Sequence, residues 1–85
     1  MSTEAEWRLL EGRETDPARD YYWHDRQRGG VRKPPCPVHP DRPWFAVAKL
    51  VDGTDGVMGH YRDEQEAKSV VEAVTRYVLD LKVSL

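Results

Sequence analysis

The stretch that decides the fold is residues 43–81, PWFAVAKLVDGTDGVMGHYRDEQEAKSVVEAVTRYVLDL. Its second half repeats apolar residues at the i, i+3, i+4, i+7 spacing of an amphipathic helix. The apolar positions are Ala67, Val70, Val71, Val74, Tyr77, Val78 and Leu81. Asp63 is a good N-cap, and Glu66 stands three residues later in the capping-box position. The pattern therefore predicts a helix that begins after Asp63 and reaches Leu81.

Before the helix, the chain has the pattern of a β-hairpin. Residues 44–51 alternate between two apolar rows, as expected of a strand. One row is Trp44, Ala46, Ala48 and Leu50, and the other is Phe45, Val47, Lys49 and Val51. Asp52-Gly53-Thr54-Asp55-Gly56 supplies turn residues, and residues 57–62 are the expected returning strand. Because both rows are apolar, one helix would leave the face of Phe45 and Val47 uncovered. The aromatic residues at positions 1–28, a third strand from the same region or a second copy of the chain could cover it.

The N-terminal 28 residues are polar and are punctuated by aromatic residues. Capping signals favour two short helices there, one over residues 4–11 with Thr3 as N-cap and one over residues 17–28 that begins at Asp16-Pro17. Gly12 and Gly29-Gly30 would end them. The alternative is a strand at residues 21–24, because the aromatic run Tyr-Tyr-Trp-His favours a pleated surface.

Residues 29–43 form a predicted connector between this arm and the hairpin. Five prolines, Pro34, Pro35, Pro37, Pro40 and Pro43, remove backbone donors and fix φ. Extended polyproline-like geometry is expected. The organisation predicted from the sequence is thus an arm (1–28), a connector (29–43) and a hairpin–helix core (43–85) in a single domain.

Length, net charge and cysteine content limit the class of protein. The chain has 85 residues, a formal net charge of −2 and one cysteine, Cys36, so an internal disulfide is excluded. Residues 1–10 lack the apolar run of a secretory signal, and no stretch reaches the roughly 20 apolar residues of a membrane span. These features predict a soluble cytoplasmic protein.

Cations concentrate in the middle of the chain and suggest a contact with nucleic acid. Residues 21–62 carry seven bases against four acids, whereas both ends are acidic. Phosphate contacts would come from this set, with aromatic residues stacking on bases: Arg26, Arg28, Arg32, Lys33, Arg42, Lys49 and Arg62. The simpler interpretation is a mixed-charge loop exposed to solvent.

Metal binding and catalysis have weaker signals. Cys36 and His39 have the spacing of half a zinc site, which His24 and His60 would complete if the connector folded back. The sequence contains no second such pair, and a free thiol is the favoured interpretation. Nucleophile, phosphate-loop and metalloprotease motifs are missing from the sequence. We therefore expect no enzyme activity and no cofactor.

The order Trp44…Lys49…Gly53…Tyr61…Glu66-Ala67 resembles the strand–turn–strand–helix pattern of the AP2-like arm-binding domains of phage integrases. The resemblance covers the stretch from Trp44 to Ala67 and rests on a generic motif. It implies DNA binding by the sheet, with contacts at Arg42, Lys49, His60 and Arg62. The chain differs from that pattern in the low number of cations on its strands.

These observations predict an α+β fold, with two or three antiparallel strands packed against the C-terminal helix. The uncovered sheet face predicts a non-catalytic binding or regulatory protein that contacts another protein, or a second copy of itself. Its anchors would be Trp23, Trp44, Phe45 and Val47, because aromatic and apolar side chains dominate such contacts. In composition the chain is similar to small accessory proteins of phages and mobile elements, including inhibitors of host machinery such as anti-CRISPR proteins. The alternatives are a nucleic-acid-binding regulator and a zinc-stabilised module.

Overall fold

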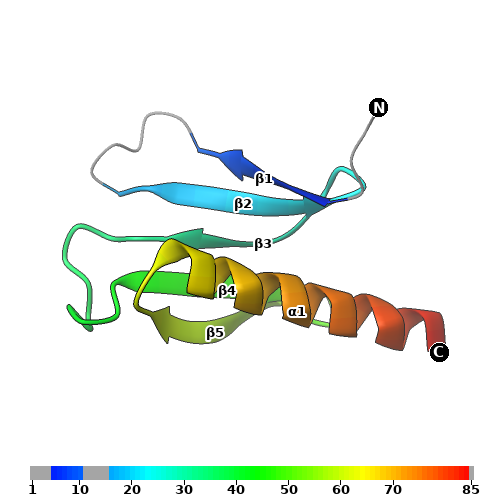
Figure 1. The fold of residues 1–85 in the computed structure, drawn as a ribbon. Helices are drawn as coiled ribbons and strands as arrows, with labels where there is room; N and C mark the ends of the chain where they lie inside the picture. The colour runs from blue at the N-terminus through cyan, green and yellow to red at the C-terminus, as the bar shows by residue number, and fades with distance from the viewer. Residues whose placement is uncertain (1–4, 11–15, 85) are drawn as a thin grey trace.

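A computed structural model of the chain describes residues 5–10 and 16–84, with side chains described as far as Leu81. Five strands precede one helix. The elements are β1 (Ala5–Leu9), β2 (Ala18–Trp23), β3 (Arg26–Arg32), β4 (Trp44–Lys49), β5 (Asp55–Tyr61) and α1 (Glu64–Ser84). The strands form one antiparallel sheet in the order β1-β2-β3-β4-β5, so every strand pairs with its neighbour in sequence (Figure 1).

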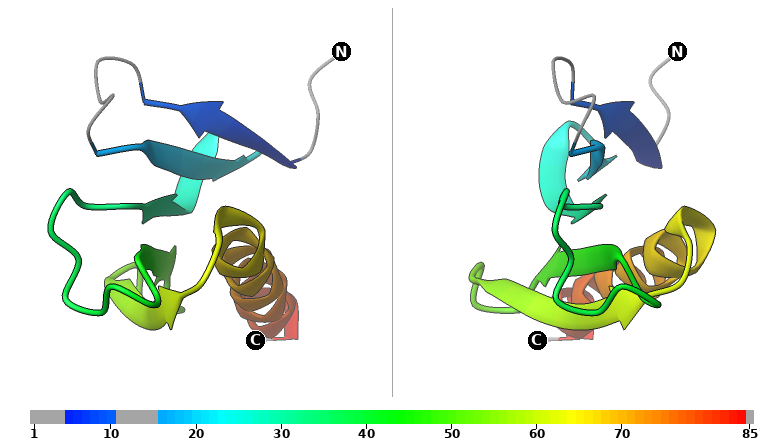
Figure 2. Two further views of the ribbon diagram at one scale, coloured as in Figure 1. Left: turned by 60° about the vertical axis from the view of Figure 1, so that its left-hand side comes forward. Right: turned by 90° about the vertical axis from the view of Figure 1, so that its left-hand side faces the viewer.

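The helix α1 lies on one side of this sheet. It packs mainly on β4, β3 and β5 (Figures 1 and 2). From β1 and β2, which extend the sheet beyond it, the side chains of Trp7 and Arg19 also reach the helix. The α+β class expected from the sequence is confirmed, with five strands in place of two or three. No helix within the described residues is long and apolar enough to cross a membrane.

The hairpin and the helix follow the sequence pattern closely. Trp44 pairs with Tyr61 and Lys49 pairs with Asp55, with one bulge where Met58 adds a residue to β5. The predicted N-cap is also present, because the backbone N–H of Glu66 donates to Asp63 Oδ1 at 2.8 Å. The strand alternation and the N-cap predicted from the sequence are therefore both present in the folded chain.

The turn between β4 and β5 lies slightly earlier than predicted. Leu50 and Val51, expected in the strand, belong to the turn, and Asp55-Gly56, expected in the turn, begin β5. The backbone N–H of Leu50 donates to the carbonyl of Thr54 at 2.8 Å. Asp52 Oδ1 accepts from both the N–H and the hydroxyl of Thr54, at 3.0 and 2.7 Å. Gly53 has a φ of +87°, a conformation that a side chain would strain. The turn thus holds itself together and sets the register of the hairpin.

The prediction of short N-terminal helices is wrong. Residues 5–9, 18–23 and 26–32 are strands, which confirms the alternative strand at residues 21–23. Thr3, Glu4, Glu11 and Gly12 lie outside the described residues. The capping signals do not decide the structure here, because β2 pairs along its length with β1 on one side and β3 on the other. This pairing stabilises the segment more than an isolated short helix would.

The boundary predicted at residues 28 and 29 lies inside β3, because Gly29 to Arg32 continue the strand and pair with β4. Gly29-Gly30 is therefore the interior of a strand and not a helix end. From Lys33 to Pro43 the chain has neither helix nor strand, as the five prolines predicted. This segment, the β3–β4 loop, carries Cys36 and His39.

The hydrophobic core lies between α1 and the middle of the sheet. Its buried members are Tyr21, Val31, Ala46, Ala48, Ala67 and Val71. Small residues on β4 let the helix approach closely, because each alanine leaves room for a side chain of α1. Trp7 extends this side of the sheet toward β1, where its ring packs on Tyr21 at 4.8 Å and its Nε1 donates to Glu72 at 3.1 Å.

Candidate functional site: the open face of the sheet

The side chains of β4 divide between two different environments. Ala46 and Ala48 point to α1 and are fully buried. Phe45 and Val47 point to the opposite side and are only partly buried. The alternation predicted from the sequence is therefore confirmed, and the described residues place no element over the second side. We call this second side the open face and define it by Ala18, Gly30, Phe45, Val47 and Val57.

The open face contains a shallow hollow of about 230 Å³. Ala18, Gly30, Phe45 and Val47 are among the residues that line it. Gly30 adds no side chain to the bottom of the hollow, and a Cβ at this position would lie 2.9 Å from Asp20 Oδ1. Three neighbouring strands thus contribute small or apolar groups to one concave surface.

Val57 extends the apolar surface from β4 to β5. It is the register partner of Val47, so both side chains lie on the same side of the sheet. Its side chain is 64% exposed. The pattern of the hairpin was enough to place this residue, although the sequence prediction of the binding residues left it out.

Ion pairs border the open face. Lys49 Nζ lies 2.7 Å from Asp55 Oδ1 at one end. Arg32 Nη2 lies 2.7 Å from Asp16 Oδ2 at the other. Over the β1–β2 part of the sheet, the Arg8 guanidinium lies 4.0 Å from the centre of the Tyr22 ring. The apolar surface is therefore bounded by paired charges, and its exposed part belongs to β4 and β5.

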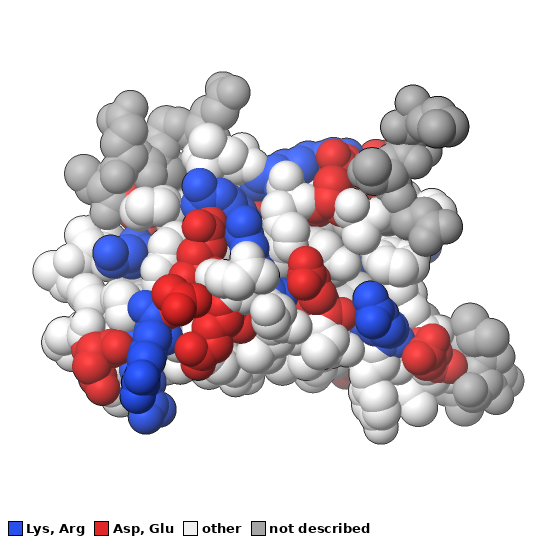
Figure 3. Space-filling view, in the orientation of Figure 1, with Lys and Arg blue, Asp and Glu red and all other residues white. Residues whose placement is uncertain are grey.

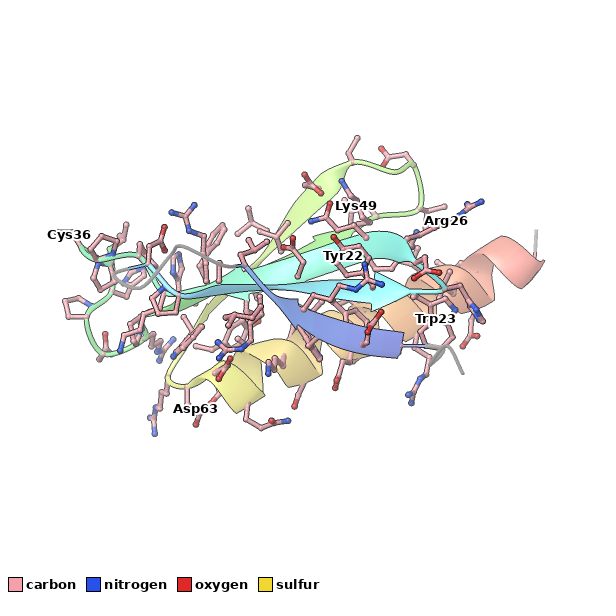
Figure 4. The ribbon with its side chains drawn as sticks, turned by 90° about the horizontal axis from the view of Figure 1, so that it is seen from above. Tyr22, Trp23, Arg26, Cys36, Lys49 and Asp63 are labelled. Carbon is pink, nitrogen blue, oxygen red and sulfur yellow. The ribbon has the colours of Figure 1, made fainter. Side chains whose placement is uncertain are left out.

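Two of the four predicted anchors lie on this face. Phe45 and Val47 line the hollow, whereas Trp44 packs against the core on the side of α1. Trp23 ends β2, where its ring packs against that of His24 at 5.8 Å. Figure 4 shows Trp23 on the α1 side of the sheet and Lys49 on the other. The tryptophans therefore do not join Phe45 and Val47 in one surface.

The seven candidate contacts to nucleic acid do not form one patch. Arg28 is 9% exposed and sits at the β3 bulge, inside the molecule. Arg32 and Lys49 are paired with carboxylates at opposite ends of the open face. The others are exposed, with Arg26 beside the β2–β3 turn and Lys33, Arg42 and Arg62 at or next to the β3–β4 loop end.

The face that carries α1 is also mixed in charge, with acidic and basic side chains interspersed (Figure 3). Arg19 and Lys68 both pair with Glu64 there. Opposite charges at this spacing cancel the far field on which phosphate binding depends.

Of the four candidate metal ligands, the structure brings two together. The rings of His39 and His60 lie 4.9 Å apart at an interplanar angle of 70°. His24 belongs to the β2–β3 turn, and Cys36 is exposed in the β3–β4 loop at the other end of the sheet, as the labels of Trp23 and Cys36 indicate (Figure 4). Among the described residues no group of three or more His, Cys, Asp and Glu side chains could hold a metal ion.

Two shifted pKa values lie away from the hollow. Burial raises the pKa of Tyr21, and the negative charge of Glu72 adds to the effect. Hydrogen bonds from the Thr54 hydroxyl and N–H lower the pKa of Asp52. Both shifts belong to groups that hold the fold, one in the core and one in the β4–β5 turn.

Comparison with known proteins adds no assignment to this geometry. The chain matches no protein-family model, no curated protein and no solved structure. The function must therefore be argued from the site itself.

Proposed function

We propose that this protein is a small non-catalytic binding module that regulates a partner protein by docking on it through the open face. The observation that carries the proposal is the asymmetry of β4, which has alanines toward α1 and Phe45 and Val47 on the uncovered side. Exposed apolar groups on a sheet cost stability and solubility unless they are used in contact. An accessory or inhibitory role would act through the same face.

The layout of the open face supports a protein partner. Its centre is apolar and concave, and its border consists of ion pairs at Lys49 and Arg32. Protein interfaces have this anatomy, with an apolar centre free of unpaired charge inside a polar rim. Phe45 and Val47 line the hollow, and Val57 beside them on β5 is 64% exposed, so aromatic and apolar contact area is available to a partner.

The size of the face favours a segment of the partner over a broad interface. Five strands with about six residues each span roughly 480 Å² at ordinary strand spacing. A standard stable protein–protein interface buries about 800 Å² of accessible surface on each partner. A strand, a turn or a helix of another protein therefore fits this face better than a second copy of the chain does.

The division of the cations supports a protein partner over nucleic acid. A phosphate-binding surface needs several unpaired cations on one side. Here Arg28 is buried, Arg32 and Lys49 are already paired, and the exposed Arg26 lies at the other end of the sheet from Lys33, Arg42 and Arg62. A zinc-stabilised module has the least support of the three candidates. Of the four candidate zinc ligands, His39 and His60 are the two that lie together.

A matched pair of variants tests the proposal. Val57 on the open face and Tyr77 on α1 are both 64% exposed, so Val57→Asp and Tyr77→Asp add the same charge at the same exposure. Each protein, with the wild type, is immobilised and used to capture partners from the native host. Captured proteins are then produced in pure form, and their affinity for the three baits is measured by calorimetry. Sedimentation velocity over a range of concentrations tests self-association at the same time.

The proposal predicts that a purified partner binds wild type and Tyr77→Asp equally and binds Val57→Asp at least tenfold more weakly. Phe45→Ser should weaken the same complex while leaving the circular dichroism spectrum unchanged. Equal affinity for all three proteins would refute the proposal. Loss of most binding between low and moderate salt would indicate nucleic acid instead, and concentration-dependent size abolished by Val57→Asp would indicate a second copy.

A further inference from the structure

A second hollow lies next to the open face, where the β3–β4 loop returns to the sheet. Its volume is about 180 Å³, and it is lined by His39, Asp41, Arg42 and His60. The first three belong to the loop and the last to β5. A backbone hydrogen bond from the N–H of Arg42 to the carbonyl of His39, at 2.9 Å, closes the turn that presents the loop residues. We call this hollow the histidine pocket.

Phe45 connects the histidine pocket to the open face. Its ring lies 5.4 Å from that of His60, its register partner on β5, and it also lines the larger hollow. A ligand that fills the larger hollow with an apolar group can therefore reach the histidine pocket by extending past Phe45. The two hollows together form one apolar site with a polar end.

The groups that line the histidine pocket favour an oxyanion. Arg42 supplies a permanent cation, the two imidazoles supply ring N–H donors, and Asp41 is the one lining carboxylate. His39, Arg42 and His60 make no ion pair with any described residue, so these donor groups are available to a ligand.

The packing of the two rings places their donors together. The ring centres of His39 and His60 lie 4.9 Å apart. The groups that face His60 are His39, Asp41 and Arg42 from the loop and Phe45 from β4. Imidazole N–H groups beside a guanidinium are donors from which an oxyanion can accept hydrogen bonds.

We propose that the histidine pocket binds a carboxylate or other oxyanion of the partner segment that occupies the open face, through the Arg42 guanidinium and the imidazole N–H groups of His39 and His60. The proposal rests on the proposed function and names the chemistry of the partner, an acidic group next to an apolar side chain. The adjacent charge and the continuous surface through Phe45 support this occupant.

The probe for the test is sulfate, an oxyanion that lacks any apolar group. Nuclear magnetic resonance of the full chain follows the imidazole resonances of His39, His60 and His24 during a titration with sodium sulfate at pH 5.5, with chloride replacing sulfate to hold ionic strength constant. We expect saturable shifts at His39 and His60 and no response at His24.

Matched variants separate the pocket from general electrostatics. His60→Asn and Arg42→Gln should abolish saturation, whereas His24→Asn and Arg26→Gln remove the same charges far from the pocket and should leave it unchanged. Val57→Asp should also leave sulfate binding intact, because it changes the open face only. The spectrum of each variant shows directly whether it is folded, and His39→Asn is the substitute if His60→Asn is not.

Two outcomes would overturn the proposal: no saturable shift at pH 5.5, or equal saturation in Arg42→Gln. A third is saturable binding of zinc at His39 and His60, which would assign the pair to a metal ion. None of these outcomes bears on the loss of partner binding in Val57→Asp, so the failure of this inference is distinguishable from the failure of the proposed function.

Discussion

The substitution Gly29→Ala tests the close contact on which the α1 side of the fold depends. Gly29 lies inside β3 with a φ of +153°, a conformation that side chains rarely adopt. A Cβ at this position would lie 2.3 Å from Val47 O, 2.9 Å from Ala48 Cα and 3.1 Å from Val71 Cγ1. The two nearest atoms belong to the backbone of β4 and cannot rotate away. The strands would have to separate to accept the methyl group.

The expected loss of stability comes from two sources. Overpacking of this kind costs about 1–3 kcal/mol. A side chain held in an unfavourable backbone region costs about 1–3 kcal/mol more. We therefore expect Gly29→Ala to lower the free energy of unfolding by about 2–6 kcal/mol. A chain of this length has roughly 4–13 kcal/mol in total, so the variant should be close to unfolding at physiological temperature.

Gly53→Ala is the matched control. Gly53 also has a positive φ, +87°, but a Cβ there meets no atom within 4 Å. It should cost only the backbone term, about 1–2 kcal/mol. Urea unfolding at 25 °C, followed by circular dichroism, measures both variants. If Gly29→Ala loses no more stability than Gly53→Ala, the contact between β3, β4 and α1 does not limit the fold and the reasoning is refuted.

Three further predictions concern the core, the pH response and the helix cap. Thr75 is 1% exposed and its Oγ1 has no hydrogen-bond partner in the described part of the chain; Thr75→Val should raise the urea midpoint by the equivalent of about 1–2 kcal/mol, and a lower midpoint would contradict this. Burial raises the pKa of Tyr21 above its ordinary value of about 10. Its contribution to stability is thus complete below about pH 10 and is lost as the pH rises through the folded-state pKa, so Tyr21→Phe should flatten the fall of melting temperature above pH 10 and Tyr77→Phe should not. Asp63→Ala removes the side-chain acceptor for the N–H of Glu66 and should cost about 1 kcal/mol in urea unfolding; an unchanged midpoint would show that the cap adds nothing.

The hairpin and α1 were predictable because their signals are local. The alternation of residues 44–49, the turn glycine at position 53 and the N-cap at Asp63 each depend on neighbours within a few positions. Tertiary packing then agrees with the local preference, so the alternation along β4 and the start of α1 are both predicted correctly. Agreement between levels of this kind is what makes a short segment predictable.

The N-terminal strands were missed because their decisive contacts are not local. Asp16-Pro17 and Gly29-Gly30 are valid helix signals in isolation. In the folded chain Tyr21 pairs with Trp7 on one side and with Gly29 on the other. Gly29 is needed there for close approach to β4, and only knowledge of the register distinguishes that role from a helix end.

The same limit applies to the site. Strand alternation alone was enough to place Phe45 and Val47 on the uncovered side, and it also put Trp44 on the other side, where the structure keeps it. The contributions of Ala18 and Gly30 to the hollow depend on the pairing of β2, β3 and β4, so no pattern within one segment indicates them.

The distribution of side-chain size across β4 is the strongest reason to regard the open face as a binding surface. Ala46 and Ala48 are 0% exposed, so each contributes little volume to a fully buried position. Phe45 and Val47, which have more apolar area, stand where no described element covers them. Selection for stability alone would place the larger side chains in the core, because buried apolar area is what stabilises a small domain. The reverse arrangement leaves apolar area at the surface, where the proposed contact with a partner would bury it.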